Sequence, residues 1–343
     1  MAEIVAPDPP EVVREPIIVD QHRIPVWKSA IRAVKKELKW GKFLFHIHRG
    51  NRRSFTHPQW SVFSFRWYLI WKVFIAAYFV IWLGLSIAHF VRQYSELSTR
   101  VKWLLYLTNW TYLIFLLYLI VTAINVVREL VVKRQRRINR RRTWHFAIQW
   151  LLWNVGATAT IIVCLVFWAF LVPTDRKTAY SASTVHVHLI NAIVIVIDLW
   201  VNAMPMQLLH VYQPMIYGAA YATFSGVYFG VQKGTGPRNK PYVYPIVQDY
   251  IHHPAFAIGA NFVMVFIVIP VVWVCLWLTY KLRVYLWENY DPQWRGQYDV
   301  HQAWEARFRG SPVQLSVISD EYDRNRGITN PAHANGELSN GHL

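Results

Sequence analysis

Six long apolar stretches, separated by shorter polar segments, organise this chain. Each stretch is long enough to cross a hydrocarbon core of about 30 Å as a helix, which takes about 20 residues. A backbone in hydrocarbon must satisfy its polar groups internally, so these stretches should be helices and not open strands. The pattern predicts an all-α polytopic membrane protein with a six-helix transmembrane bundle over residues 67–281. The six spans are expected at about residues 67–91, 101–127, 145–172, 183–203, 207–231 and 256–280.

The segments that flank the bundle are polar. Residues 1–25 contain many prolines and are predicted to be disordered. Residues 26–66 form a basic cytoplasmic segment in which apolar residues recur at helical spacing among lysines and arginines. This predicts a basic amphipathic helix before the first span, in contact with anionic lipid headgroups; an ordinary solvated helix is the alternative. The residues that carry its apolar face are Trp27, Ile31, Val34 and Leu38.

The formal net charge of the 343-residue chain is +17, which raises the question of a nucleic-acid partner. The positive charge, however, is concentrated in alternate segments, as expected where basic loops stay in the cytoplasm. The basic segments are residues 1–66, 128–142 and the tail that starts at Lys281, whereas the intervening loops carry fewer lysines and arginines. This distribution predicts cytoplasmic N and C termini and no nucleic-acid partner. The tail, residues 282–343, is expected to be cytoplasmic and largely disordered from about residue 311.

Polar side chains inside the predicted spans need an explanation, because ionisable groups in a bilayer are costly and often functional. The fourth span is the richest in such residues. At about 100° per residue, His188, Asn191 and Asp198 share one broad face of this helix, and His186 points away from it. The whole set comprises Thr108, Asn109, Asn154, Thr158, His186, His188, Asn191, Asp198, Asn202 and His210.

Thr108 and His188 are a candidate catalytic pair. The second and fourth spans run in the same direction, and both residues lie a turn or two below the outer end of their span. A threonine hydroxyl becomes a nucleophile when a base such as neutral histidine removes its proton. Asn191, one turn from His188, could orient the ring, and Asn191 and Asn154 are candidate oxyanion donors. The structural alternative is that Thr108 bonds its own helix and His188 joins two helices.

Asp198, Asn202 and His210 form a second polar group near the cytoplasmic ends of the fourth and fifth spans. An ion pair between Asp198 and His210 would neutralise this layer, and structural stabilisation is favoured over a proton or ion relay of a transporter. No metal site is expected, because His186 and His188 face opposite sides and no other ligand cluster has a recognisable spacing. No cofactor is expected either.

Three strings resemble the rolling stone family of multi-pass membrane proteins. The stretch Tyr106-Leu107-Thr108-Asn109-Trp110 is similar to a motif of its second span, and the residues from His188 to Pro214 are similar to its fourth and fifth spans. The third string, an outer-loop motif, is Tyr244-Pro245-Ile246-Val247 followed by Asp249. The resemblance covers about residues 60–285 and implies a role in myoblast fusion or other cell-surface events.

More distantly, the pattern resembles the androgen-induced family of intramembrane threonine hydrolases, which cleave fatty acid esters of hydroxy fatty acids. The motif match places Thr108 on the family's threonine and His188 on its histidine, with Asp198 at the acidic position ten residues later. Asn109 and Trp110 follow rolling stone instead of this hydrolase pattern.

Two functions are therefore expected from different classes. The first is a Thr108/His188 hydrolase of long-chain acyl esters, with membrane lipids as substrates and without other known partners. The second is a non-enzymatic membrane protein of cell–cell fusion or adhesion. Either would be an integral protein of the plasma membrane or the endoplasmic reticulum.

Overall fold

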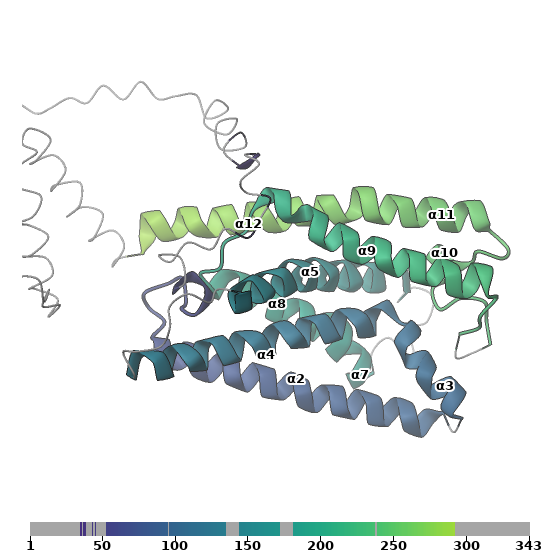
Figure 1. Ribbon diagram of the computed structural model, residues 1–343, viewed down its shortest axis with the longest axis horizontal. Helices are drawn as coiled ribbons and strands as arrows, with labels where there is room; N and C mark the ends of the chain where they lie inside the picture. Colours follow the sequence, from purple (N-terminus) through teal and green to yellow (C-terminus); the bar gives the residue numbers. More distant parts are fainter. Residues whose placement is uncertain are drawn as a thin grey trace, which may run out of the picture.

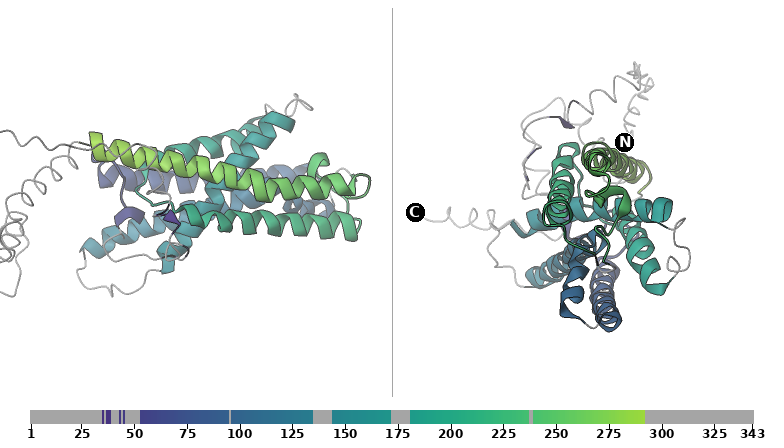
Figure 2. Two further views of the ribbon diagram at one scale, coloured as in Figure 1. Left: turned by 90° about the horizontal axis from the view of Figure 1, so that it is seen from above. Right: turned by 90° about the vertical axis from the view of Figure 1, so that its right-hand side faces the viewer.

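The computed structural model describes residues 53–94, 96–134, 144–171, 181–236 and 239–291, together with residues 35, 37, 38, 43 and 45. The predicted disordered ends and nearly all of the predicted amphipathic helix lie outside these residues. Within the described part the chain is helical and contains no strand, which confirms the all-α prediction. The long helices run mostly along one axis (Figure 1; Figure 2).

Three long helices begin the bundle, and a short connection lies between the first two. Local sequence sets their boundaries: the Ser64 side chain accepts a hydrogen bond from the Trp67 N–H at 3.4 Å and so caps the first helix. The elements are α2 (Phe65–Gln93), α3 (Leu97–Val101), the 3₁₀ turn η3 (Lys102–Leu105), α4 (Leu107–Arg134) and α5 (Trp144–Val166), with α5 continuing as the π turn η4 (Phe167–Leu171).

Three further helical runs complete the bundle, and each contains a π turn. Ser181 caps the first of these runs through a hydrogen bond from Thr184 N–H at 3.2 Å, and Pro254 occupies the first turn of the last. The runs are α7 (Ala182–Val185) with η5 (His186–Ile190) and α8 (Asn191–Val201); η6 (Leu208–Val211) with α9 (Tyr212–Ser225) and η7 (Gly226–Val231); and, after the short α10 (Pro245–Gln248), α11 (Pro254–Val263) with η8 (Met264–Val268) and α12 (Ile269–Tyr290).

Among the residues that the structure describes, five helices are long and apolar enough to cross a membrane, namely Phe65–Gln93, Leu107–Val131, Trp144–Phe170, Ala182–Val201 and Pro254–Tyr290. The predicted fifth span, 207–231, is helical from Leu208 to Val231 and lies beside α11 and α12 (Figure 1), but it is not among these five helices. The expected count of six is therefore not confirmed. The helix that contains the last predicted span, 256–280, continues to Tyr290.

The two ends of the bundle can be told apart by their connections. The Ser61 N–H donates to a carboxylate oxygen of Asp291 at 2.8 Å, so the start of α2 and the end of α12 lie together. We call this the terminal end. The opposite end, which carries the connections 94–106 and 232–253, is called the loop end (Figure 1).

Residues 53–64 cover the terminal end as an irregular segment. The Gln59 N–H donates to the Val201 carbonyl at 2.8 Å, and the Trp60 indole N–H donates to the Trp200 carbonyl at 2.7 Å. The Gln149 side-chain amide donates to the Phe55 carbonyl at 3.0 Å. This part of the predicted basic segment therefore packs on the helix ends of the bundle.

α5 is the central helix and α2 is peripheral. In the most apolar window of each, 67% of α5 but only 17% of α2 is buried. The α2 residues Trp67, Phe74 and Ile81, which recur every seven positions, are all exposed, as expected of a stripe that faces lipid. The core around α5 is mainly aromatic and includes Phe79, Phe115, Tyr118, Trp150, Trp153 and Trp273.

Candidate functional site

A buried ion pair joins three helices near the terminal end. The Lys72 ammonium of α2 donates to one carboxylate oxygen of Asp198 on α8, and the Tyr118 hydroxyl of α4 donates to the other. Lys72 is fully buried and Asp198 is 1% exposed. A charge this deep in protein persists only when it is paired and hydrogen-bonded. The carboxylate also accepts from the Asn202 side-chain amide at 3.3 Å.

Arg283 of α12 holds the turn that follows α8. One of its terminal nitrogens donates to the carbonyls of Leu199 and Asn202, each at 2.6 Å, and the other donates to the Met204 carbonyl at 3.0 Å. The last carbonyls of a helix have no partner within the helix, and a cation is favourable there. Arg283 is fully buried, so the turn is held by a side chain that has no access to water.

This arrangement differs from the predicted ion pair between Asp198 and His210. Asp198 is neutralised by Lys72 instead, and the ring Nδ1 of His210 lies 3.1 Å from the side-chain nitrogen of Asn154. The same Asn154 nitrogen donates to the Gln213 side-chain oxygen at 2.8 Å. His210 belongs to a separate polar group because the 3₁₀ turn η6 turns it toward α5.

Asn154 lies deeper than expected of an oxyanion donor. Its neighbour Trp153 packs on Tyr118 with ring centroids 5.1 Å apart. Tyr118 follows Thr108 by ten positions on α4, which corresponds to about 15 Å along the helix. The structure therefore places Asn154 with His210 and does not bring it to Thr108.

At the loop end, the hydroxyl of Thr108 lies 3.4 Å from the hydroxyl of Tyr244. Thr108 is 9% exposed. Desolvation raises the pKa of Tyr244 above its ordinary value, although hydrogen bonds from the Thr108 side chain and backbone oppose the shift. The Tyr244 phenol is therefore neutral at physiological pH and is able to donate a hydrogen bond.

Gln248 holds Tyr244 in this position. Its side-chain oxygen accepts from the N–H groups of Val243 and Tyr244, both at 2.9 Å, and its amide donates to the Tyr221 hydroxyl at 2.9 Å. Tyr221 in turn donates to the Leu105 carbonyl at 2.7 Å. Gln248 is fully buried, so one buried amide attaches this segment to α9 and, through the Tyr221 hydroxyl, to η3.

The remainder of the 232–253 segment is attached to the bundle by further polar contacts. The Tyr250 hydroxyl lies 3.0 Å from that of Ser225, and the Asn261 amide donates to Tyr250 at 3.0 Å. Asp249 accepts from the backbone N–H and the ring of His252 at 3.2 and 2.9 Å. Desolvation raises the pKa of Asp249, but these two hydrogen bonds outweigh it and hold the pKa below its ordinary value.

His186 lies in a cage of aromatic rings. It is 2% exposed and stacks on Trp82 with ring centroids 4.1 Å apart. The rings of Phe79, Tyr78 and Tyr112 lie 5.2, 5.4 and 6.0 Å away. Neither of its ring nitrogens has a hydrogen-bond partner. His186 therefore faces α2 and α4.

His188 stacks flat on Phe167, with ring centroids 3.7 Å apart and an interplanar angle of 4°. Its Nδ1 is buried and has no partner, and the same is true of the Asn191 side-chain oxygen. The Asn191 amide donates to the Val187 carbonyl at 2.9 Å and not to a histidine ring. These side chains point in other directions than a regular α-helix predicts, because they lie on or next to the π turn η5. Its wider i→i+5 hydrogen bonds alter the angle between successive side chains around the helix axis.

Thr108 and His188 are not hydrogen-bonded to each other in the described structure. Tyr112 lies one turn, or about 6 Å, from Thr108 along α4, and its ring centroid is 6.0 Å from that of His186 on η5. In this part of the bundle Thr108 is paired to Tyr244, and the ring nitrogens of His186 are unpaired.

Within the described ranges, no three histidine, cysteine, aspartate or glutamate side chains come together in a way that could hold a metal ion. Sequence reasoning missed Lys72, Arg283 and Tyr244. A lysine within an apolar stretch was a usable signal for Lys72. Arg283 lies beyond the predicted last span, among the positive charges of the predicted tail.

Comparisons with known proteins are consistent with this helical architecture. The family model described as Protein rolling stone matches residues 25–298. The chain is similar to Protein rolling stone of Drosophila melanogaster, with 28% identity over 193 residues, which cover 53% of this chain and 68% of the relative. No solved structure matches the chain.

Proposed function

This chain belongs to the rolling stone family of membrane proteins, and we propose that the loop end of its bundle is an intramembrane site for the hydrolysis of lipid esters. Thr108 is the nucleophile and His188 the base. The observation that carries the proposal is the set of buried, unpaired polar atoms of His186 and His188 on η5. Buried polar groups in proteins are nearly always paired, so those that are not call for a functional explanation. π turns are also frequent at functional sites.

The proposed topology has six crossings, with the helical run from Leu208 to Val231 as the fifth. The contact between Ser61 and Asp291 supports an even number, because it brings both ends of the bundle together. The terminal end then faces the cytoplasm and the loop end lies in the outer leaflet. Residues 26–52 would add a basic segment that binds anionic headgroups of the inner leaflet.

In the proposed reaction the Thr108 oxygen attacks the ester carbonyl while its proton passes to a His188 nitrogen. The alcohol leaves with that proton, and water then releases the fatty acid from the threonine ester by the same base. Burial of the acyl chain among apolar side chains would supply binding energy at about 0.8 kcal/mol per CH₂.

The described conformation would be the resting state of this site. Thr108 is paired to Tyr244, and His188 lies flat on Phe167. Substrate would replace the Tyr244 hydroxyl at Thr108, and the His188 ring would turn away from Phe167 to reach the threonine.

The experiment is covalent labelling of the purified full chain with a lipophilic fluorophosphonate, with the modified residue located by mass spectrometry. Thr111 is a matched control for Thr108, because it lies one turn away and its hydroxyl is 3.1 Å from that of Tyr217. Label on Thr108 that is lost in Thr108→Ala, retained in Thr111→Ala and reduced in His188→Phe supports the proposal. Well-folded protein that takes no label contradicts it.

A second candidate function is non-enzymatic cell–cell fusion or adhesion, with the 232–253 segment and the start of α11 as the contact surface. It is favoured by the internal hydrogen bonds of that segment, which fix its shape, and by two exposed apolar side chains there, Ile251 and Phe256. In a cell-mixing assay this function requires that Ile251→Ser and Phe256→Ser reduce fusion while Thr108→Ala does not.

A further inference from the structure

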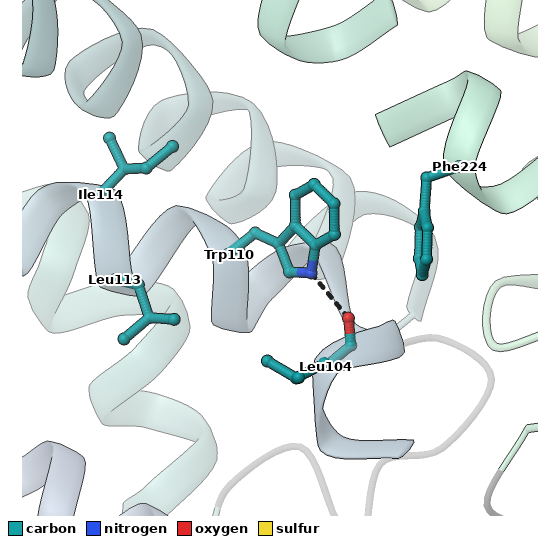
Figure 3. A pocket seen from close by; sticks show the side chains of 5 residues that line it. All are labelled: Leu104, Trp110, Leu113, Ile114 and Phe224. Carbon is teal, nitrogen blue, oxygen red and sulfur yellow. Dashed lines mark hydrogen bonds between the residues drawn. The ribbon is translucent and has the colours of Figure 1, made fainter. Parts of the chain in front are cut away.

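A groove between α4 and α9 opens at the loop end (Figure 3). Its volume is about 370 Å³, and its wall contains no polar surface. The Trp110 indole N–H would be an unpaired polar group in this apolar wall, but it donates to the Leu104 carbonyl at 2.6 Å. Phe224 packs on Trp110, with ring centroids 5.1 Å apart, so the two rings form one continuous part of the lining. The lining residues are Leu104, Trp110, Leu113, Ile114 and Phe224.

A cation lies at the loop end of this groove. Lys102 precedes Leu104 by two residues, and its ammonium donates to the Thr235 hydroxyl at 3.2 Å and to the Gly236 carbonyl at 3.3 Å. The Thr235 carbonyl accepts from the Tyr228 hydroxyl at 3.1 Å, and Tyr228 stacks on Phe224. The bridge from Lys102 therefore joins the same two sides that form the groove. An ammonium has three N–H groups, and the structure records acceptors for two of them.

The opposite end of the groove continues into an apolar stripe. On α4 the stripe passes from Leu113 to Leu117 and Ile124, and the last two are each 50% exposed. These positions lie on one face of the helix, because they are separated by four and seven residues. A cation above an apolar channel that continues along a span matches the shape of a lipid with a phosphate headgroup.

We propose that this groove binds one glycerophospholipid, with an acyl chain lying against Leu113, Ile114 and the packed ring pair of Trp110 and Phe224, and the phosphate on Lys102. The ligand class follows from the pairing of a positive charge with an apolar wall. Neutral sterols and free hydrocarbon have no group that needs the ammonium. This binding site is independent of the hydrolytic site, because Trp110 and Thr108 are two residues apart and so project from nearly opposite faces of α4.

The test is photolabelling of the full chain in lipid nanodiscs with a phosphatidylcholine that carries a diazirine in one acyl chain. Label should concentrate on the residues that line the groove and should be competed by unlabelled phosphatidylcholine. Ile114→Trp, which fills the groove, should remove most of it, whereas the matched variant Ile124→Trp on the open stripe should not. Lys102→Gln should lower labelling by about tenfold at limiting probe, and Lys102→Arg should retain it.

Three outcomes would overturn the proposal. Label spread evenly over the exposed faces of all spans would mean contact with bulk lipid only. A diazirine sterol that labels the groove equally in wild type and Lys102→Gln would assign the groove to sterols. Competition by unlabelled phosphatidylcholine needs no variant, so its absence in wild type would overturn the proposal even if Ile114→Trp does not fold.

Discussion

Two groups of buried polar side chains in the bundle differ in how they are hydrogen-bonded. Near the terminal end, Lys72 is paired with Asp198 of α8, and Arg283 donates to the carbonyls at the end of the same helix. On η5 and at the start of α8, His186 and Asn191 are also buried, but both ring nitrogens of His186 and the side-chain oxygen of Asn191 have no hydrogen-bond partner. Paired groups fix the relative positions of helices, whereas unpaired groups lower stability. The comparison therefore distinguishes buried polar residues that stabilise the fold from buried polar residues that do not.

The largest effect is expected from breaking the buried ion pair. Asp198→Asn leaves the Lys72 ammonium without its counter-charge and should cost about 3–5 kcal/mol of stability. The measurement is unfolding in detergent, or the yield of monodisperse protein if the variant is too unstable to unfold reversibly. The double variant Lys72→Met/Asp198→Leu should recover most of the loss. If Asp198→Asn is as stable as wild type, the pair does not hold the bundle.

Arg283→Lys should destabilise by about 1.5–3 kcal/mol, because one ammonium cannot reach the carbonyls of Leu199, Asn202 and Met204 together. The same unfolding experiment measures it, with hydrogen exchange across residues 199–206 as a local readout. Exchange that rises only outside this turn would contradict the assigned role.

His186→Phe should leave stability unchanged or raise it by about 1 kcal/mol, since it removes two unpaired nitrogens from an aromatic cage and keeps a ring of similar size. The matched variant Trp82→Leu, which removes the stacked neighbour, should destabilise. If the His186→Phe variant unfolds as readily as Asp198→Asn, the unpaired and the paired buried groups contribute equally to stability, and the comparison fails.

The smallest effect is a pH dependence of the loop end. The pKa of Asp249 is lowered in the folded protein, so its contribution to stability is present above the unfolded pKa of about 3.9 and is lost as the pH falls through the lower folded pKa. Hydrogen exchange of residues 243–253, corrected for its intrinsic pH dependence, should increase in that range. Asp249→Asn should exchange faster at neutral pH and lose the acid response. If the pH dependence of exchange is the same in Asp249→Asn as in wild type, groups other than Asp249 cause it.

Much of the fold could be predicted from sequence because hydrocarbon permits few backbone structures. A run of apolar residues such as 145–172 can only be a helix in a bilayer, and its length sets the crossing. The angular positions of side chains were less predictable. A single π turn that starts at His186 changes which residues face the bundle, and the local amino-acid composition does not predict this turn.

The candidate site was predicted in part. The positions of Thr108 near the start of α4 and of His186 and His188 near the start of their helical run followed from the apolar stretches in the sequence. Their partners were not predictable: Tyr244 reaches Thr108 from 136 residues further along the chain, and Lys72 reaches Asp198 across 126 residues. Such contacts depend on how helices pack, which a single sequence does not specify.

The amino-acid sequence by itself determined that this is a helical membrane protein, which residues are apolar enough to span, and which polar residues have to be explained. Those properties follow from the cost of placing polar groups in hydrocarbon, a cost that each segment incurs alone. Only the tertiary structure decided which polar groups are paired and which are left without a partner. Pairing depends on the rotation and approach of neighbouring helices, and these are set by side-chain packing throughout the whole bundle.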